Sequence, residues 1–215
     1  LDLSDDEAVD RLAAEAVEQL GGVDILVNNA GIPKRRHVTQ LDAATVNAVM
    51  AINYLSPVRL TLALLPHMLA RGSGRIVNVS SVAAPLSSPG ESAYDASKAA
   101  LAVFSEAMAV DLWESGIKVT VVYPGVVDTE LFTLPDNDTF TGDVEAISVS
   151  EAVGAIFDGI AAGSLAVYVP EYFSSFAKDK AKDVDTFVAG MAAYVKARQA
   201  GGRDAGADGS VGGPA

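Results

Sequence analysis

The chain has 215 residues, a length that suits one globular domain with a sizeable core. Its net charge of -13 and its pI near 4.4 disfavour a nucleic-acid partner or an anionic membrane surface, because both reward a basic face. The absence of cysteine excludes disulfides, cysteine nucleophiles and thiolate metal sites, and two isolated histidines predict no metal site. With no apolar run of roughly 18 residues and no apolar signal core, we expect a cytoplasmic protein without a membrane anchor.

The amino-terminal part of the sequence predicts a helix followed by a strand. Ser4 or Asp5 is a favourable N-cap, acidic residues follow in the first turn, and apolar residues recur at helical spacing until Gly21. The apolar run 23–28 is then typical of a short strand buried on both faces.

A long helical pattern covers residues 41–70, where two prolines, Pro57 and Pro66, predict a kink or a break. Asn53 interrupts the apolar face of this pattern with a polar side chain. Such an asparagine can be satisfied by its own helix, or it can serve a site. Upstream of this pattern, the basic cluster 34–37 is interpreted as a solvated loop beside a cleft, and the alternative is recognition of an acidic substrate.

The second half of the chain continues the alternation of strands and helices. We expect a strand at 74–81, a helix at 92–115, a strand at 118–123, a polar segment at 132–146, a helix from Ser148 or Ser150 to 162, a strand at 165–170, an apolar helix containing residues 176–195, and a disordered tail at 200–215. This order predicts an α/β fold with a doubly wound parallel sheet between two helical layers, forming one domain over residues 1–199.

The stretch 81–98 carries the strongest indication of chemistry. Tyr94 and Lys98 are four residues apart at the start of a helical pattern, so both side chains project from one face. An ammonium beside a phenol favours the phenolate, which would lower the pKa of Tyr94 and allow proton transfer. Ser81 follows a strand and can face Tyr94 across a cleft. Alone, the Tyr-x-x-x-Lys pair is weak evidence, because such pairs occur on many solvated helices.

Several further motifs, taken with this pair, resemble the short-chain dehydrogenase/reductase family. They are the Asn28-Asn29-Ala30-Gly31 turn after one strand, Asn53 in a helix, Ser81 thirteen residues before Tyr94, and Pro124-Gly125 after a third strand. The similarity extends from the first residue to about Pro170. It implies a Rossmann-like fold and reversible hydride transfer between a nicotinamide cofactor, NAD or NADP, and a small alcohol or ketone.

The resemblance also implies roles for individual residues. Tyr94 would be the general acid or base, Lys98 would lower its pKa and hold the nicotinamide ribose, Ser81 would bind the substrate oxygen, and Asn53 would complete a proton relay. The expected cofactor-binding residues are Asp2, Asn28, Asn29, Ala30, Gly31, Tyr94, Lys98, Pro124, Gly125, Val127 and Thr129. For Asp2 a helix-capping role is as plausible as contact with the adenine, and for the Asn-Asn-Ala-Gly turn the alternatives are a ribose contact or a tie to a neighbouring strand.

One element of a dinucleotide site is missing from the sequence. Such a site begins with a strand, a glycine-rich turn and a helix whose amino end takes the pyrophosphate, but Gly21 and Gly22 lie between a helix and a strand. We therefore expect a sheet that is incomplete on its amino-terminal side, with the strand at 23–28 as an exposed apolar edge. The alternative function is an inactive fragment or a dimerising partner.

The family resemblance leads to two further expectations. The segment 131–149 corresponds to the mobile lid that shapes the substrate pocket. The helix that carries Tyr94 commonly packs in a family dimer, so we expect a homodimer.

Overall fold

The computed structural model of the chain describes residues 2–139 and 144–205. The chain divides into two compact units, Leu1–Ser174 and Ser175–Ala215, where the sequence led us to expect one domain through residue 199. All the strands and all the candidate site residues belong to the first unit.

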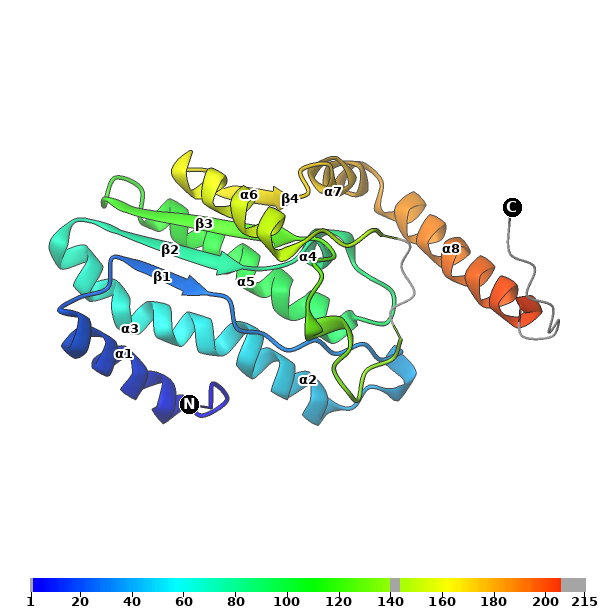
Figure 1. The fold of residues 1–215 in the computed structure, drawn as a ribbon, viewed down its shortest axis with the longest axis horizontal. Helices are drawn as coiled ribbons and strands as arrows, with labels where there is room; N and C mark the ends of the chain where they lie inside the picture. Colours follow the sequence, from blue (N-terminus) through cyan, green and yellow to red (C-terminus); the bar gives the residue numbers. More distant parts are fainter. Residues whose placement is uncertain (1, 140–143, 206–215) are drawn as a thin grey trace. The chain divides into compact units, whose positions relative to one another are not determined.

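The first unit is built on a sheet of four parallel strands in the order β1-β2-β3-β4 (Figure 1). The strands are β1 (Ile25–Asn28), β2 (Gly74–Val79), β3 (Ile117–Pro124) and β4 (Ala166–Val169). Asn28 pairs with Asn78, and Pro124 pairs with Val169, so the carboxyl ends of the strands meet at one edge of the sheet. This arrangement confirms the predicted α/β fold with a parallel sheet.

Helices cover both faces of this sheet (Figure 1). One layer contains α1 (Asp6–Leu20), α2 (Ala43–Met50), η2 (Ala51–Leu55), α3 (Ser56–Arg71) and α5 (Ser92–Asp111), and the opposite layer contains α6 (Val149–Ala161). Shorter pieces are η1 (Val38–Gln40), α4 (Ala83–Leu86) and η3 (Glu130–Phe132). The three layers are those of a Rossmann-like fold.

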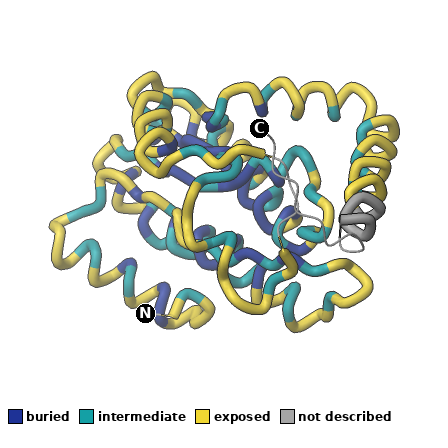
Figure 2. Tube along the Cα trace, turned by 45° about the vertical axis from the view of Figure 1, so that its right-hand side comes forward, coloured by how far each residue is buried: buried dark blue, intermediate teal, exposed yellow. Residues whose placement is uncertain are grey.

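Buried residues gather along the central strands (Figure 2), and the alternation of side chains along β2 explains how two cores form there. Ile76 packs with Met68 of α3 and Met108 of α5, whereas its neighbour Val77 packs on the opposite face with Ala152 of α6. Successive strand residues point to opposite faces, and both residues of β2 are fully buried because both faces are covered here.

β1 lies at the edge of the sheet, and there the sequence prediction fails. Leu26 is buried, but Ile25 and Val27 are 56% and 54% exposed, so this strand is not buried on both faces. Among the described residues, the helix α6 that packs over Val77 of β2 does not cover these two side chains of β1. In the described part of the chain, β1 has a partner strand on one side only, which agrees with the expected exposed apolar edge.

The predicted helix boundaries hold in part. Asp5 is the N-cap of α1, and Ser148 caps α6 in a reciprocal capping box with Glu151. The long helix is not broken at Pro57 or Pro66, since α2, η2 and α3 follow one another without a gap and η2 is a π-helical turn.

Helix α5 ends at Asp111, four residues before the predicted end, and Gly116 accounts for the tight connection to β3. Gly116 has a φ of 83°, and a Cβ built on it would lie 2.0 Å from the carbonyl oxygen of Gly72. Only glycine fits this close approach of two backbones.

The stretch Ala43–Arg71 is long and apolar enough, by length and composition, to cross a bilayer. In this structure its carboxyl-terminal part contributes Leu64 and Met68 to the core under the sheet. A core helix of this kind passes the same test of length and composition.

The second unit contains helix α8 (Val184–Ala205), and α7 (Phe173–Lys182) precedes it across the division between the units. The single apolar helix predicted around residues 176–195 is thus two helices. Residues 200–205, predicted to be disordered, form the end of α8, and the rest of the predicted tail, 206–215, lies outside the described residues.

Candidate active site at the carboxyl ends of the strands

Tyr94 and Lys98 lie in the first turns of α5, which begins at Ser92 next to the carboxyl end of β2. Lys98 is 4% exposed, and its Nζ donates a hydrogen bond of 2.8 Å to the carbonyl oxygen of Val79. The same nitrogen lies 5.8 Å from the centroid of the Tyr94 ring. The helical spacing therefore brings a phenol and an amine to one place at the end of a strand.

Two serines follow β2 and point to different partners. The hydroxyl of Ser80 donates to the carbonyl oxygen of Lys98 at 2.8 Å, which fixes α5 against the strand. Ser81 accepts from the amide of Ala83 at 3.1 Å, and its side chain is near enough to Tyr94 to lower the pKa of the phenol. Ser81 is thus the serine that the structure brings together with the phenol.

Asn53 lies in the π-helical turn η2 and is fully buried. Its Oδ1 accepts from the amide of Ile32 at 2.8 Å, while its Nδ2 donates to the carbonyl of Ile32 and to the hydroxyl of Ser97, both at 3.0 Å. Asn53 is therefore not satisfied by its own helix. It ties the loop after β1 to the helix that carries Tyr94.

Gly31 explains why the loop after β1 has small residues. A Cβ built on Gly31 would lie 3.1 Å from Lys98 Nζ and 3.2 Å from Asn53 Oδ1, so the backbone passes close to both functional groups. A side chain here would compete for the space next to the Lys98 amine.

The proton affinities of the two titratable groups follow mainly from burial. Burial raises the pKa of Tyr94 well above its ordinary value; the hydrogen bond with Ser81 lowers it, and the nearby carboxylates of Glu91 and Asp95 raise it further. Burial also lowers the pKa of Lys98 to about 8. We expected the Lys98 ammonium to lower the pKa of Tyr94, and that direction is wrong for the chain alone because desolvation dominates.

The other asparagine of the turn, Asn28, ties neighbouring elements together. Its Nδ2 donates to Asn78 Oδ1 at 2.7 Å and to Thr61 Oγ1 at 3.1 Å, and Asn78 Nδ2 donates to Ser105 Oγ at 2.7 Å. This buried chain of hydrogen bonds joins β1, β2, α3 and α5 behind the site. Of the two roles considered for Asn28, the structure has the tie to a neighbouring strand.

Asn29 and Ala30 are exposed after the carboxyl end of β1 and precede Gly31, which lies close to Lys98. The third predicted loop lies beside Ser81, because the carbonyl of Pro124 accepts from the amide of the next residue, Val82, at 2.9 Å. The structure thus brings three predicted loops to the same edge of the sheet.

The remaining predicted cofactor residues have local roles in the structure. A Cβ on Gly125 would lie 2.5 Å from the ring of Phe173, and Val127 forms a bridge with Ile147. Thr129 is exposed before η3. Asp2 accepts from the amide and hydroxyl of Ser4, which lowers its pKa, so it caps a local turn before α1.

The basic cluster 34–37 is not the solvated loop that the sequence suggested. Arg35 is 5% exposed, and its guanidinium donates to the carbonyl oxygens of Phe132 and Asp138. Sequence reasoning missed Arg35, together with Asn78 and Ser97. A signal for Arg35 was present in the acidic residues of the 136–138 segment, which complement the basic cluster in charge.

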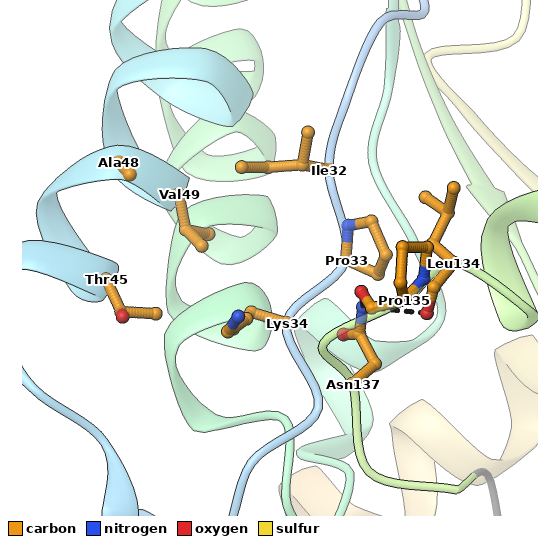
Figure 3. A pocket seen from close by; sticks show the side chains of 9 residues that line it. All are labelled: Ile32, Pro33, Lys34, Thr45, Ala48, Val49, Leu134, Pro135 and Asn137. Carbon is orange, nitrogen blue, oxygen red and sulfur yellow. Dashed lines mark hydrogen bonds between the residues drawn. The ribbon is translucent and has the colours of Figure 1, made fainter.

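A cavity of about 330 Å³ lies between this loop, α2 and the 132–138 segment (Figure 3). Its lining is mostly apolar and consists of Ile32, Pro33, Lys34, Thr45, Ala48, Val49, Leu134, Pro135 and Asn137. Ile32, which lines the cavity, follows Gly31 in the chain and donates its amide to Asn53 Oδ1, so the cavity adjoins the loop beside Lys98. Its outer wall belongs to the predicted lid, of which residues 140–143 lie outside the described part.

The groups at this edge of the sheet fit the nicotinamide end of a dinucleotide. The amine of Lys98 and the phenol of Tyr94 can donate hydrogen bonds to a ribose and its base, and the glycine and exposed backbone after β1 leave room for a ligand beside them. Among the described residues, no glycine-rich turn connects a strand to a helix as a pyrophosphate site requires.

Comparisons with known proteins agree with this geometry. The short chain dehydrogenase family model matches residues 1–138. Dehydrogenase/reductase SDR family member 7B of Mus musculus is 37% identical over 198 residues, which are 91% of this chain and 58% of the relative. The 2-(R)-hydroxypropyl-CoM dehydrogenase of Xanthobacter autotrophicus is 40% identical over 133 residues, 60% of this chain and 53% of that protein. The chain thus spans somewhat over half the length of these relatives.

Solved structures show the same architecture. A short-chain dehydrogenase from Streptomyces avermitilis matches with a TM-score of 0.75 and 30% identity, covering 93% of this chain and 78% of that one. A short chain dehydrogenase from Burkholderia cenocepacia, solved in complex with NADP, has a TM-score of 0.75 and 28% identity, covering 89% and 76%. The chain therefore belongs to the short-chain dehydrogenase/reductase family, whose members use nicotinamide cofactors.

Proposed function

We propose that this chain is the catalytic part of an NAD(P)-dependent oxidoreductase that transfers a hydride between a nicotinamide and a secondary alcohol or a carbonyl compound. The observation that carries the proposal is the meeting of Ser81, Tyr94 and Lys98 at the carboxyl end of β2. Ligands bind at this edge in doubly wound sheets. When bound, the nicotinamide supplies or accepts the hydride.

In this proposal the chain's own residues place the substrate oxygen and move a proton to or from it. Ser81 donates a hydrogen bond to that oxygen, and Tyr94 Oη exchanges the proton. The raised pKa of Tyr94 keeps its phenol protonated near neutral pH, which is the form that donates to a carbonyl. Asn53, which joins Ile32 in the loop after β1 to Ser97 in α5, completes the relay of the proton.

The proposed contacts to the cofactor come from three loops at the same edge. Lys98 and the backbone of Asn29–Gly31 hold the nicotinamide ribose, and the loop from Pro124 to Thr129 borders the nicotinamide. The NADP complex of the Burkholderia cenocepacia relative supports a nicotinamide dinucleotide as the ligand. The cavity next to Ile32 is proposed to take the apolar body of the substrate, because apolar side chains predominate in its lining.

A homodimer is part of the proposal. Leu55, Leu62 and Leu69 lie at seven-residue spacing along η2 and α3 and are 52%, 55% and 44% exposed. Val103 and Val110 repeat the same spacing on α5 and are 65% and 73% exposed, and Trp113 follows at 80%. Large exposed apolar side chains in such stripes favour packing of α3 and α5 against a second copy.

A second candidate function is supported by the edge of the sheet. The exposed Ile25 and Val27 on β1 are suited to pairing with further protein, and the described residues contain no pyrophosphate turn. These features favour an inactive fragment or a dimerising partner that does not hold a dinucleotide.

Turnover distinguishes the two candidates. The chain is incubated with NADH or NADPH and a panel of aldehydes and ketones, and loss of the reduced nicotinamide is followed by its absorbance. We expect turnover that falls by a factor on the order of 10² or more in Tyr94→Phe, with nucleotide affinity nearly unchanged. Equal kcat in the wild type and the variant would refute the assignment of Tyr94.

A further inference from the structure

The loop after β1 and the 130–139 segment are joined by an unusually dense set of polar contacts. The amide of Arg35 donates to Asn137 Oδ1 at 2.8 Å, its carbonyl accepts from the amide of Asp138 at 2.8 Å, and the amide of His37 donates to Asp138 Oδ2 at 3.2 Å. Lys34 and Arg36 both bind the side chain and the carbonyl of Asp136. These residues are about 100 positions apart in sequence.

Arg35 is the buried member of this set. Its Nε donates to the carbonyl of Asp138 at 3.0 Å and its Nη2 to the carbonyl of Phe132 at 2.9 Å, while the guanidinium lies 5.6 Å from the centroid of the Phe132 ring. A planar guanidinium can reach two carbonyls and stack on a ring at once, which an ammonium cannot. The two bonds span both ends of the turn that forms the outer wall of the cavity.

The same guanidinium also faces the beginning of the catalytic helix. Arg35 Nη1 lies 3.9 Å from Oε1 of Glu91, the residue before the first turn of α5, and the two side chains are 6% and 12% exposed. Both charges reach Tyr94, where Glu91 raises the pKa and Arg35 lowers it. The amide of Arg36 adds a bond of 2.6 Å to the carbonyl of Gly90.

The two neighbouring basic residues differ from Arg35 in an informative way. Lys34 and Arg36 share one carboxylate, that of Asp136, whose side chain is 71% exposed. Exposed ion pairs of this kind contribute little to stability because water and salt screen them. The buried contacts of Arg35 are charge-assisted and shielded from water, and their loss is expected to cost more.

We propose that Arg35 is a positioning residue that couples the 130–139 segment to the start of helix α5, so that the wall of the substrate cavity and the catalytic tyrosine are held in one arrangement. The catalytic half of this statement rests on the proposed function. The structural half concerns three segments that one buried guanidinium joins, and it can be tested without nucleotide or substrate.

Hydrogen–deuterium exchange of the full chain tests the coupling. In Arg35→Gln, exchange of the backbone amides in the 130–139 segment should accelerate on the order of 10-fold or more, as expected when charge-assisted hydrogen bonds are lost. The matched control Arg36→Gln, which loses only the pairing with exposed Asp136, should change exchange less than about 3-fold. The exchange rate in Arg35→Lys should lie between those of the two variants, because lysine keeps the positive charge but lacks the planar guanidinium that reaches two carbonyls.

A second readout separates positioning from general loosening. The carboxyl resonance of Glu91, assigned with Glu91→Gln, should titrate at higher pH in Arg35→Gln than in the wild type, and Arg36→Gln should leave it unchanged. The direction follows because burial raises the pKa of Glu91 and Arg35 opposes that rise. Should Arg35→Gln fail to fold, Glu91→Gln takes its place, and faster exchange of the 130–139 segment in that variant would support the coupling.

Equal exchange in Arg35→Gln and Arg36→Gln, or an unmoved Glu91 titration, would overturn the proposal. In a variant that turns over, we expect KM for the carbonyl compound to rise more than kcat falls, with nucleotide affinity unchanged. Faster exchange in Arg35→Gln together with no turnover in the wild type would instead count against the proposed function alone, so the two failures are distinguishable.

Discussion

The carboxyl ends of the strands and the free edge of the sheet differ in how their side chains are satisfied. Around Tyr94, the buried side chains of Asn53 and Lys98 have protein partners, as the three hydrogen bonds of Asn53 illustrate. Along β1, apolar side chains face water, with Ile25 and Val27 more than half exposed. One region therefore has its polar groups paired internally, and the other has apolar surface that further protein could cover.

This difference separates the proposed catalytic residues from the part of the fold that would bind the pyrophosphate. The residues proposed to contact the substrate oxygen and the nicotinamide ribose follow β1, β2 and β3 or lie on α5, and all of them belong to the described part of the chain. A pyrophosphate turn is not among the described residues, and the exposed edge of β1 lies on the side where another strand could pair. Catalytic geometry and nucleotide retention can thus be tested apart.

The largest expected effect concerns the buried amine of Lys98. Its folded pKa of about 8 lies below the ordinary 10.5, so between these values the unfolded chain binds more protons and stability rises with pH. The contribution is fully present above 10.5 and is lost as the pH falls through about 8. Relative to Lys98→Met, the free energy of unfolding of the wild type should gain up to about 3 kcal/mol across this window. Urea unfolding at several pH values measures the difference, and parallel curves for the two proteins would contradict it.

A smaller effect is expected from the hydrogen-bond chain behind the site. Asn78→Ala should lower the free energy of unfolding by about 2 kcal/mol. The substitution removes the acceptor of one Asn28 Nδ2 hydrogen bond and the donor to the buried hydroxyl of Ser105. Asn29→Ala, at an exposed position next to Asn28, should change it by less than about 0.5 kcal/mol. Chemical denaturation of both variants provides the comparison. Equal losses of unfolding free energy would show that these buried hydrogen bonds do not contribute to stability beyond an exposed side chain.

The next effect separates activity from stability. Gly31→Ala places a methyl group 3.1 Å from Lys98 Nζ and should reduce kcat/KM about tenfold, equivalent to about 1.4 kcal/mol. Gly154→Ala on α6 meets no atom within 4 Å and should instead raise helix stability by about 0.5–1 kcal/mol with unchanged activity. An active Gly31→Ala enzyme would mean that the amine has room to move.

The smallest expected change in stability is at the free edge. Val27→Lys should alter the free energy of unfolding by less than about 0.5 kcal/mol, because the side chain is 54% exposed, yet it should reduce association beyond the proposed dimer of α3 and α5. Val27→Thr, which adds no charge, serves as the control in sedimentation or light scattering. If both variants associate as the wild type does, β1 is not the surface responsible.

The sequence predicted the elements near the catalytic motif better than the long-range polar contacts. Four-residue spacing placed Tyr94 and Lys98 on one face of a helix, and a capping residue before α6 was recognised because caps are local. The direction of the Tyr94 pKa was missed because desolvation depends on what surrounds a residue in three dimensions. Arg35 was missed for the same reason, since its partners Phe132 and Asp138 are about 100 residues away.

The most direct measurement is nucleotide binding by this chain. Titration with NADH and NADPH, followed by nicotinamide fluorescence, should give saturable binding of at least one of them, and Lys98→Met should weaken it because the ribose loses its amine. Folded wild-type protein that binds neither nucleotide would contradict the account and favour the inactive fragment or dimerising partner.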